Sequence, residues 1–233
     1  MPSEEKVASF SDVLEMHAKI ASQGDVCGDC FAVEKGADGS IFVMVADVTG
    51  KGGPAAIYAS MLLATFKYIC KIKDVGPEFI TGEINDLIID MGDDEMGASL
   101  IIFKIDALSG ATYGCNAGHE NPICIKPDGT IRWLELDGGG PPAGVVRGYP
   151  YPSAKCQLSP GDTILLVTDG VTEASDTKQN MFGREGLEST IRKWSPAAPV
   201  KALVNLLVES VRRFEGETEP SDDVTVFAFR RKE

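Results

Sequence analysis

The architecture of this chain follows from one segment, Ile41-Phe42-Val43-Met44-Val45-Ala46-Asp47. Its first six residues are apolar without alternation, so a strand formed here must be covered on both of its faces. Together with residues 31–33 and the glycine-containing turn at 36–39, residues 41–48 predict a β-hairpin. We therefore expect a doubly covered strand that ends at a carboxylate, Asp47.

Helices and strands follow in blocks along the rest of the chain. A proline at position 54 suits the first turn of a helix, and the apolar residues from 200 to 214 recur at helical spacing. The predicted helices cover about 54–73, 77–91, 184–194 and 200–214. The predicted strands cover about 98–105, 111–116, 123–126, 130–134, 154–158, 163–168 and 224–229. Many antiparallel strands interrupted by helix pairs favour an α+β fold, with two packed sheets and helices outside them.

The chain reads as a single domain over residues 1–233. Its 233 residues, 43% of them hydrophobic, are enough for one sizeable core, and we find no internal repeat or long linker. Residues 1 to about 22 are expected to form a short helical lead-in, with Val13, Leu14 and Ile20 as its apolar positions.

Charge and hydropathy exclude some classes of partner. The net charge is −13 and basic residues are scattered, whereas a nucleic-acid-binding protein normally carries a basic stripe for phosphate contacts. Residues 1–6 lack the features of a signal peptide. The longest apolar run, 55–66, is interrupted by polar residues and falls short of the roughly 18–20 residues that span a bilayer. We expect a cytoplasmic protein that binds neither nucleic acid nor membrane.

Six cysteines are present, and two of them, Cys27 and Cys30, have the spacing of a redox pair or of half a zinc site. The other four are isolated and the chain has only two histidines, so no second half of a zinc site is evident. Buried, unreactive thiols are the favoured interpretation.

Three aspartates occupy equivalent places at strand ends. Asp47 follows residues 41–46, Asp169 follows 164–168, and Asp222 with Asp223 precedes 224–227. A carboxylate at a buried strand end is costly unless positive charge compensates it. No lysine or arginine recurs beside all three, so a cation held among them would meet the shared need.

Oxygen ligands favour Mg²⁺ or Mn²⁺ over zinc. Two such ions about 3.5–4 Å apart can activate a water and clamp a phosphoryl group for in-line attack. The simpler alternative is that each aspartate is a turn residue or a helix cap. For any single aspartate that alternative is favoured, and spacing alone leaves the two interpretations balanced.

The chain also carries a family resemblance. Short blocks between about residues 24 and 230 resemble, in the same order, the motifs of the bacterial SpoIIE/RsbU-type PP2C (PPM) serine/threonine phosphatases. The blocks are Gly28-Asp29, Asp47-Val48-Thr49-Gly50-Lys51-Gly52, Asn116-Ala117-Gly118-His119-Glu120-Asn121-Pro122, Thr168-Asp169-Gly170-Val171-Thr172-Glu173-Ala174, Phe182-Gly183-Arg184-Glu185-Gly186-Leu187 and Ser221-Asp222-Asp223-Val224-Thr225. Each block alone is weak evidence, but their order over nearly the whole chain is specific.

The resemblance implies a β-sandwich of two antiparallel sheets in α-β-β-α layers, with a site for two Mn²⁺ or Mg²⁺ ions at one end. By the family pattern, Asp47 would bridge both ions with help from the Val48 carbonyl, and Asp169 and Asp222 would hold the second ion. Asp29 and Asp223 would order metal-bound waters. A hydroxide between the ions would attack phosphoserine or phosphothreonine on a regulatory protein, such as an anti-sigma-factor antagonist.

The chain also departs from the family pattern. Cys27 and Cys30 stand where a glycine and an aromatic residue are usual, which leaves the local packing open. No arginine precedes residue 132 to hold phosphate as in larger relatives, and Thr49 and Gly50 replace a histidine after the bridging aspartate. His119 is interpreted as structural, because its motif is expected to lie away from the metal motifs.

Two other functions compete with a phosphoprotein phosphatase. One is a phosphatase-like binding module without turnover, which the presence of Asp47, Asp169 and Asp222 disfavours. The other is a metal phosphoesterase that acts on a small molecule, for which a deep pocket would be the sign. Since the motif blocks span nearly the whole chain and leave no room for a sensor domain, we expect control to come from an activating partner or from a sensor domain in flanking sequence.

Overall fold

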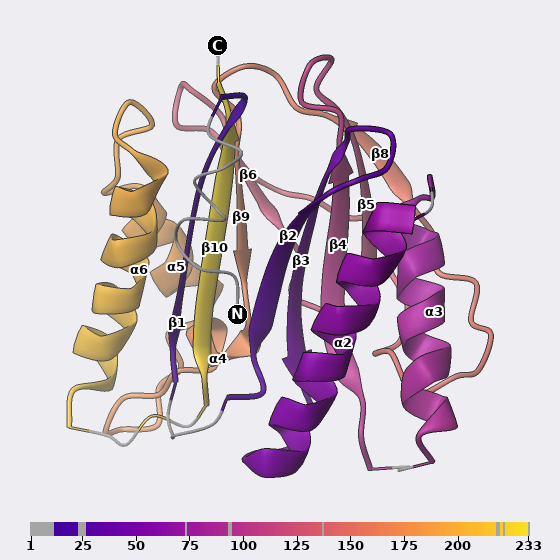
Figure 1. The fold of residues 1–233 in the computed structure, drawn as a ribbon. Coiled ribbons are helices and arrows are strands. Elements are labelled where there is room, and N and C mark those ends of the chain that lie inside the picture. The colour runs from indigo at the N-terminus through magenta and orange to yellow at the C-terminus, as the bar shows by residue number, and fades with distance from the viewer. Residues whose placement is uncertain are drawn as a thin grey trace.

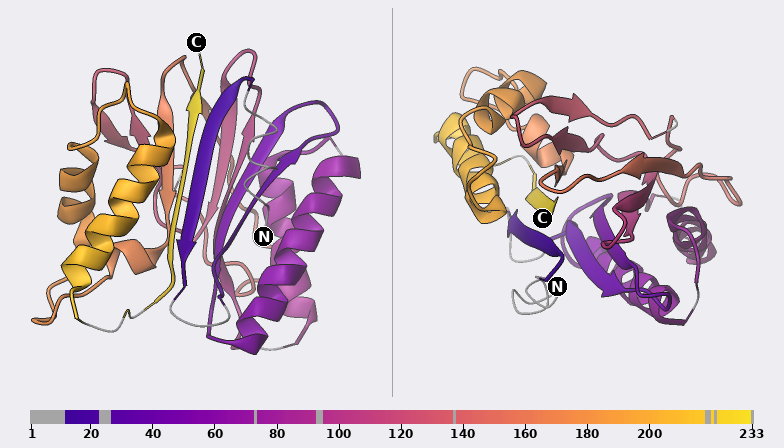
Figure 2. Two further views of the ribbon diagram at one scale, coloured as in Figure 1. Left: turned by 60° about the vertical axis from the view of Figure 1, so that its left-hand side comes forward. Right: turned by 90° about the horizontal axis from the view of Figure 1, so that it is seen from above.

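Two five-stranded antiparallel sheets pack face to face in a computed structural model that describes residues 12–22, 27–72, 74–92, 95–136, 138–217, 220 and 222–232. One sheet has the order β1-β10-β9-β6-β7 and is called the β10 sheet; the other has the order β2-β3-β4-β5-β8 and is called the β3 sheet. Figures 1 and 2 show α2 and α3 on the outer face of the β3 sheet, and α5 and α6 on the outer face of the β10 sheet. The expected α-β-β-α sandwich is confirmed.

The strands of the β10 sheet are β1 (Leu14–Ala21), β6 (Ile123–Ile125), β7 (Ile131–Trp133), β9 (Thr163–Val167) and β10 (Val224–Arg231). Those of the β3 sheet are β2 (Cys30–Lys35), β3 (Ile41–Val48), β4 (Ala98–Ile105), β5 (Ala111–Ala117) and β8 (Ala154–Gln157). The helices are α2 (Gly53–Ile72), α3 (Pro77–Asp90), α4 (Asp169–Thr172), α5 (Gly183–Ile191) and α6 (Val200–Glu215). Predicted elements agree with these within a few residues, except for α4 and β1.

Strand β3 is covered on both faces, as the unbroken apolar segment predicts. Val43 and Val45 pack between the sheets with Phe227 of β10. Met44, from the opposite face, packs under the helices with Phe66 of α2. Seven of the eight residues of β3 are buried, and the exception is Asp47 at its end. The buried part of β3 therefore places Asp47 at the end of the sandwich, where its side chain is partly exposed.

The expectation of a helical lead-in is wrong for the described residues. Leu14–Ala21 is a strand that pairs with β10 over its whole length. Its alternate residues Leu14, Met16, Ala18 and Ile20 pack between the sheets, which is the period of two of a strand rather than the period of a helix. Residues 1–11 lie outside the described part. The lead-in is thus an integral edge strand of the β10 sheet.

By its length and its apolar composition alone, helix α2 could cross a membrane. In the fold it lies against β2 and β3, and its buried residues include Leu62 and Phe66. Its hydropathy is therefore accounted for by its place as a covering helix of the sandwich.

Candidate metal centre

The predicted acidic residues meet at one end of the sandwich. In Figure 1 this is the lower end, where β3 and β9 terminate, β10 begins and the short helix α4 lies. Asp47 is the second-last residue of β3, and the pairing of Cys30 with Ala46 brings Asp29, the residue before Cys30, beside Asp47. The side-chain alternation that turns Val45 between the sheets turns Asp47 the same way.

Asp29 joins the two sheets. It is only 2% exposed, and its Oδ2 accepts hydrogen bonds from the hydroxyls of Thr168, at 2.9 Å, and Thr225, at 2.5 Å. The Thr225 backbone N–H donates to Thr168 Oγ1 at 3.0 Å, so both threonines are themselves held in place. One carboxylate from the β3 sheet is thereby fixed to the ends of β9 and β10.

The two metal motifs of the β10 sheet are in direct contact. Asp169 begins α4, and a side-chain carbon added to Gly170 would lie 2.0 Å from the Asp223 carbonyl oxygen and 3.5 Å from Asp222 Cβ. Asp222 Oδ1 accepts from the Asp223 N–H at 2.8 Å. Only a glycine allows the backbone at 170 to approach residue 223 this closely.

Gly28 joins the two sheets at a second point. Its backbone N–H donates to Asp223 Oδ2 at 3.2 Å. A Cβ at this position would stand 2.9 Å from the carbonyl oxygen of Val48, the predicted backbone ligand. The structure therefore brings all six predicted metal-site residues to this end: Asp29, Asp47, Val48, Asp169, Asp222 and Asp223.

Electrostatic strain marks the cluster. Burial raises the pKa of Asp29 above its usual range, partly opposed by the hydrogen bond from Thr225, and Asp47 adds to the rise. Burial, then the charges of Asp169 and Asp222, raises the pKa of Asp47. Burial and the charge of Asp222 raise the pKa of Asp169, whose Oδ1 is buried without a hydrogen-bond partner in the described part of the chain. Like charges held together raise pKa values in this way.

This donor set fits a hard divalent cation. It consists of carboxylates and one carbonyl, the ligands of Mg²⁺ and Mn²⁺, and positive charge among them would relieve the repulsion that raises their pKa values. Among the described residues, no three His, Cys, Asp or Glu side chains are already arranged to hold an ion. Mg²⁺ prefers a few protein oxygens, with water completing its coordination. Such a site agrees both with the oxygen donor set and with the lack of a preformed three-residue cluster among the described residues.

We expected the segment 116–122 to lie away from the metal motifs, and this expectation is wrong. His119 Nδ1 is hydrogen-bonded to Ser99 Oγ at 2.8 Å, and Ser99 is the residue of β4 that pairs with Asp47. Thr172 of α4 donates to Glu120 Oε1 at 3.2 Å. His119 is buried, which lowers its pKa to about 4, so the imidazole is neutral at pH 7.

Sequence reasoning missed three polar residues of this end: Ser99, Thr168 and Thr225. The two threonines lie inside the motif blocks, so the signal was present but was assigned to the neighbouring aspartates. Ser99 carries no such signal, because only the register of β3 with β4 places it opposite Asp47.

All six cysteines are free thiols, and Cys27 and Cys30 form no disulfide. Burial is the largest cause that raises the pKa of both thiols, and Asp223 raises that of Cys27 further. A raised pKa disfavours the reactive thiolate, in agreement with the interpretation of these cysteines as unreactive.

A sandwich of this kind, with acidic motifs gathered at one end, defines the class of PP2C-type phosphatase domains. The family model described as stage II sporulation protein E (SpoIIE) matches residues 37–232. The chain belongs to the SpoIIE family of PP2C-type serine/threonine phosphatases.

Known proteins are similar over nearly all of this chain. Protein IcfG of Synechocystis sp. is 26% identical over 93% of it, and phosphoserine phosphatase RsbU of Bacillus subtilis is 25% identical over 95%. The match covers 38% of the first relative and 64% of the second, so the chain spans less than two thirds of either. The crystal structure of the RsbU and RsbW domains of a Mycobacterium tuberculosis protein superposes with a TM-score of 0.81 at 24% identity, covering 94% of this chain and 60% of that one.

Two further structures of the same fold, with TM-scores of 0.69 and 0.68, were solved with magnesium or manganese. Divalent metals thus occur in domains of this fold.

We predict that Gly170→Ala destabilises the chain by several kcal/mol and removes metal binding. The added methyl would enter the space of the Asp223 carbonyl, and backbone must shift to accommodate it. Thermal unfolding and Mn²⁺ calorimetry measure the two effects.

Gly82→Ala is the matched control. Gly82 lies inside α3, and nothing lies within 4 Å of the added carbon. This variant should leave metal binding unchanged and raise stability by roughly 0.5–1 kcal/mol. Equal effects of both variants would contradict the prediction.

Proposed function

We propose that this chain is a Mn²⁺- or Mg²⁺-dependent protein phosphatase that hydrolyses phosphoserine or phosphothreonine on a regulatory protein. The observation that carries the proposal is the convergence of Asp29, Asp47, Asp169, Asp222 and Asp223, from both sheets, at one end of the sandwich. Burying these carboxylates together is unfavourable, because their negative charges repel one another and are removed from water. Cations bound among them would compensate this cost.

The proposed roles follow the position of each residue. Asp47, where the β3 sheet meets the β10 sheet, would hold both ions, with the Val48 carbonyl beside it. Asp169 and Asp222 would hold the second ion. Bound divalent ions lower the pKa of water and offset the charge of a phosphoryl group. The two threonine hydroxyls keep Asp29 in place, and Gly28 does the same for Asp223.

The substrate and its control belong to the same proposal. Family membership and the relative named phosphoserine phosphatase support a phosphorylated protein substrate, and an anti-sigma-factor antagonist is the substrate class we propose. Because the similar regions of the relatives are parts of longer chains, we propose control by an activating partner or by a sensor domain. We also place the reaction in the cytoplasm.

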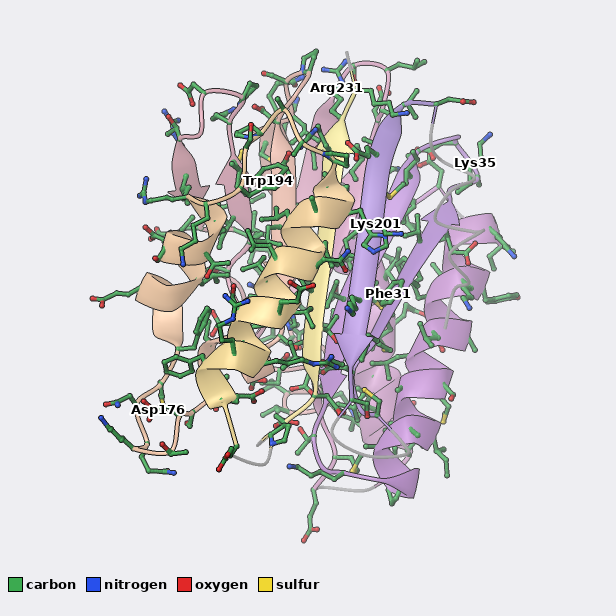
Figure 3. All side chains as sticks on the ribbon, turned by 90° about the vertical axis from the view of Figure 1, so that its left-hand side faces the viewer. Phe31, Lys35, Asp176, Trp194, Lys201 and Arg231 are labelled. Atoms are coloured by element: carbon green, nitrogen blue, oxygen red, sulfur yellow. The ribbon has the colours of Figure 1, made fainter. Side chains whose placement is uncertain are left out.

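A small-molecule substrate receives less support. A cavity of about 1040 Å³ is lined by residues such as Lys35, Lys104 and Leu108, and these belong to the end opposite the acidic residues. Figure 3 shows Lys35 near that upper end and Asp176 near the lower one. A deep pocket at the acidic end would favour a small molecule, whereas a phosphorylated side chain on a protein can reach an open site.

The test compares hydrolysis of a phosphoserine peptide and of p-nitrophenyl phosphate by the full chain, with Mn²⁺ and with EDTA. We expect hydrolysis of both that requires the metal. Hydrolysis of p-nitrophenyl phosphate with none of any phosphopeptide or phosphoprotein would favour a small-molecule phosphoesterase. Metal binding without any hydrolysis, even with a candidate partner present, would favour a binding module.

A further inference from the structure

His119 is held in a turn with little freedom. Asn116 Nδ2 donates to the His119 carbonyl at 3.0 Å, and the His119 N–H donates to Asn116 Oδ1 at 2.8 Å. Gly118, between them, has φ of 68°, and a side-chain carbon there would lie 2.7 Å from Pro142. Both backbone groups of His119 are therefore satisfied by one buried asparagine, and the position of the imidazole is set by the turn.

The imidazole contacts the strand next to Asp47. Its Nδ1 is 2.8 Å from Ser99 Oγ, and Ser99 pairs directly with Asp47 across β3 and β4. Directly opposed residues of antiparallel strands point to the same face, with Cβ atoms about 4.5–5.5 Å apart. The Ser99 hydroxyl is therefore in contact with His119 on one side and is a neighbour of the Asp47 carboxylate on the other.

The protonation of the imidazole decides what Ser99 can do. Since His119 is neutral, one ring nitrogen carries the proton and the other is an acceptor. Nε2 is buried and has no hydrogen-bond partner in the described part of the chain, so the proton is better placed on Nδ1, where Ser99 Oγ accepts it. The hydroxyl proton of Ser99 is then available to a carboxylate, and Asp47 is the carboxylate opposite.

Packing alone does not explain this arrangement. A buried nitrogen without a partner destabilises the fold, whereas apolar groups in place of both partners of a buried hydrogen bond can be neutral or stabilising. We propose that His119 and Ser99 are positioning residues, which orient the Asp47 carboxylate for the cations. The inference rests on the metal-dependent function proposed above.

The test measures Mn²⁺ affinity by calorimetry on the full chain, separately from catalysis. Ser99→Ala and His119→Leu should each weaken Mn²⁺ binding by about tenfold or more, the range for partners of metal ligands. The double variant should bind no more weakly than the weaker single variant, because both act through one hydrogen bond. His119→Asn, whose amide lies near the place of Nδ1, should retain more affinity than His119→Leu. In EDTA, the double variant should unfold at or above the wild-type temperature.

Ser153→Ala is the matched control, because the Ser153 hydroxyl is buried but, unlike that of Ser99, has no hydrogen-bond partner among the described residues; it should leave Mn²⁺ affinity unchanged. Wild-type affinity in both Ser99→Ala and His119→Leu would overturn the proposal. If His119→Leu fails to fold, the smaller change Ser99→Ala decides. Wild-type Mn²⁺ binding without hydrolysis, even with a candidate partner present, would refute the proposed function alone, whereas a wild-type chain that binds no Mn²⁺ would refute both.

Discussion

Asp169→Asn is expected to lower Mn²⁺-dependent turnover by at least about a thousandfold while leaving the fold intact. Charge stabilisation by a bound metal is worth several kcal/mol, and each 1.36 kcal/mol corresponds to a factor of about ten in rate. The fold should tolerate the change, because Asp169 Oδ1 has no hydrogen-bond partner to lose in the described part of the chain, and burial and Asp222 already disfavour its charge. Steady-state hydrolysis of p-nitrophenyl phosphate gives the rate, and thermal unfolding in EDTA gives the stability.

The control for this variant is Asp106→Asn. Asp106 lies in the turn between β4 and β5, at the opposite end of the sandwich, where its carboxylate accepts from the Ser109 hydroxyl at 2.6 Å. Figure 3 shows Arg231 at the upper end of the sandwich, and this arginine donates to the carbonyl oxygens of Ala107 and Leu108 in the same turn. The control should keep wild-type turnover. An Asp169→Asn protein with unchanged kcat would refute the assignment of Asp169 to the metal centre.

The second large effect concerns stability and pH. Because the pKa values of Asp29, Asp47 and Asp169 are raised in the fold, the folded chain binds more protons than the unfolded chain above the ordinary carboxyl pKa of about 4. The contribution of these three carboxyl groups to the stability of the metal-free chain should therefore be greatest at the low end of the range from about pH 5 to about pH 8, and it should be lost as pH rises through the raised values. Saturating Mn²⁺ should reduce this loss, because the cation replaces the protons. Unfolding by urea from about pH 5 to about pH 8, in EDTA and in Mn²⁺, measures both.

Asp29→Asn isolates one part of the effect. The asparagine oxygen can still accept from Thr168 and Thr225, but the buried charge is removed. In EDTA at about pH 8 the variant should be more stable than wild type by on the order of 1–3 kcal/mol, and the gain should shrink toward pH 5. His119, whose lowered pKa has the opposite sign, is common to both proteins and cancels in the difference. A stability difference independent of pH would contradict the prediction.

A sequence pattern predicted the structure of a segment correctly where neighbouring residues alone decide that structure, and less well where distant parts of the chain decide it. The unbroken apolar segment 41–46, next to a glycine-containing turn, predicted a strand covered on both faces, and that strand was found. Residues 14–21 are less decisive: their apolar positions fit a period of two, but a short mixed segment is also compatible with a helix. Pairing with β10 selected the strand, and the two paired segments, 14–21 and 224–231, are far apart in the sequence.

By itself, the sequence determined the sandwich class, through the resemblance of its ordered motifs to a family, and it named the aspartates that the fold brings together, because each motif and each strand-end carboxylate can be recognised in a short segment. Only the tertiary structure decided that Thr168 and Thr225 hold Asp29, that Gly170 must lack a side chain beside Asp223, and that His119 reaches Ser99 beside Asp47. Each of these contacts joins residues distant in the chain, and its geometry is set by strand register and sheet packing, which no local pattern encodes.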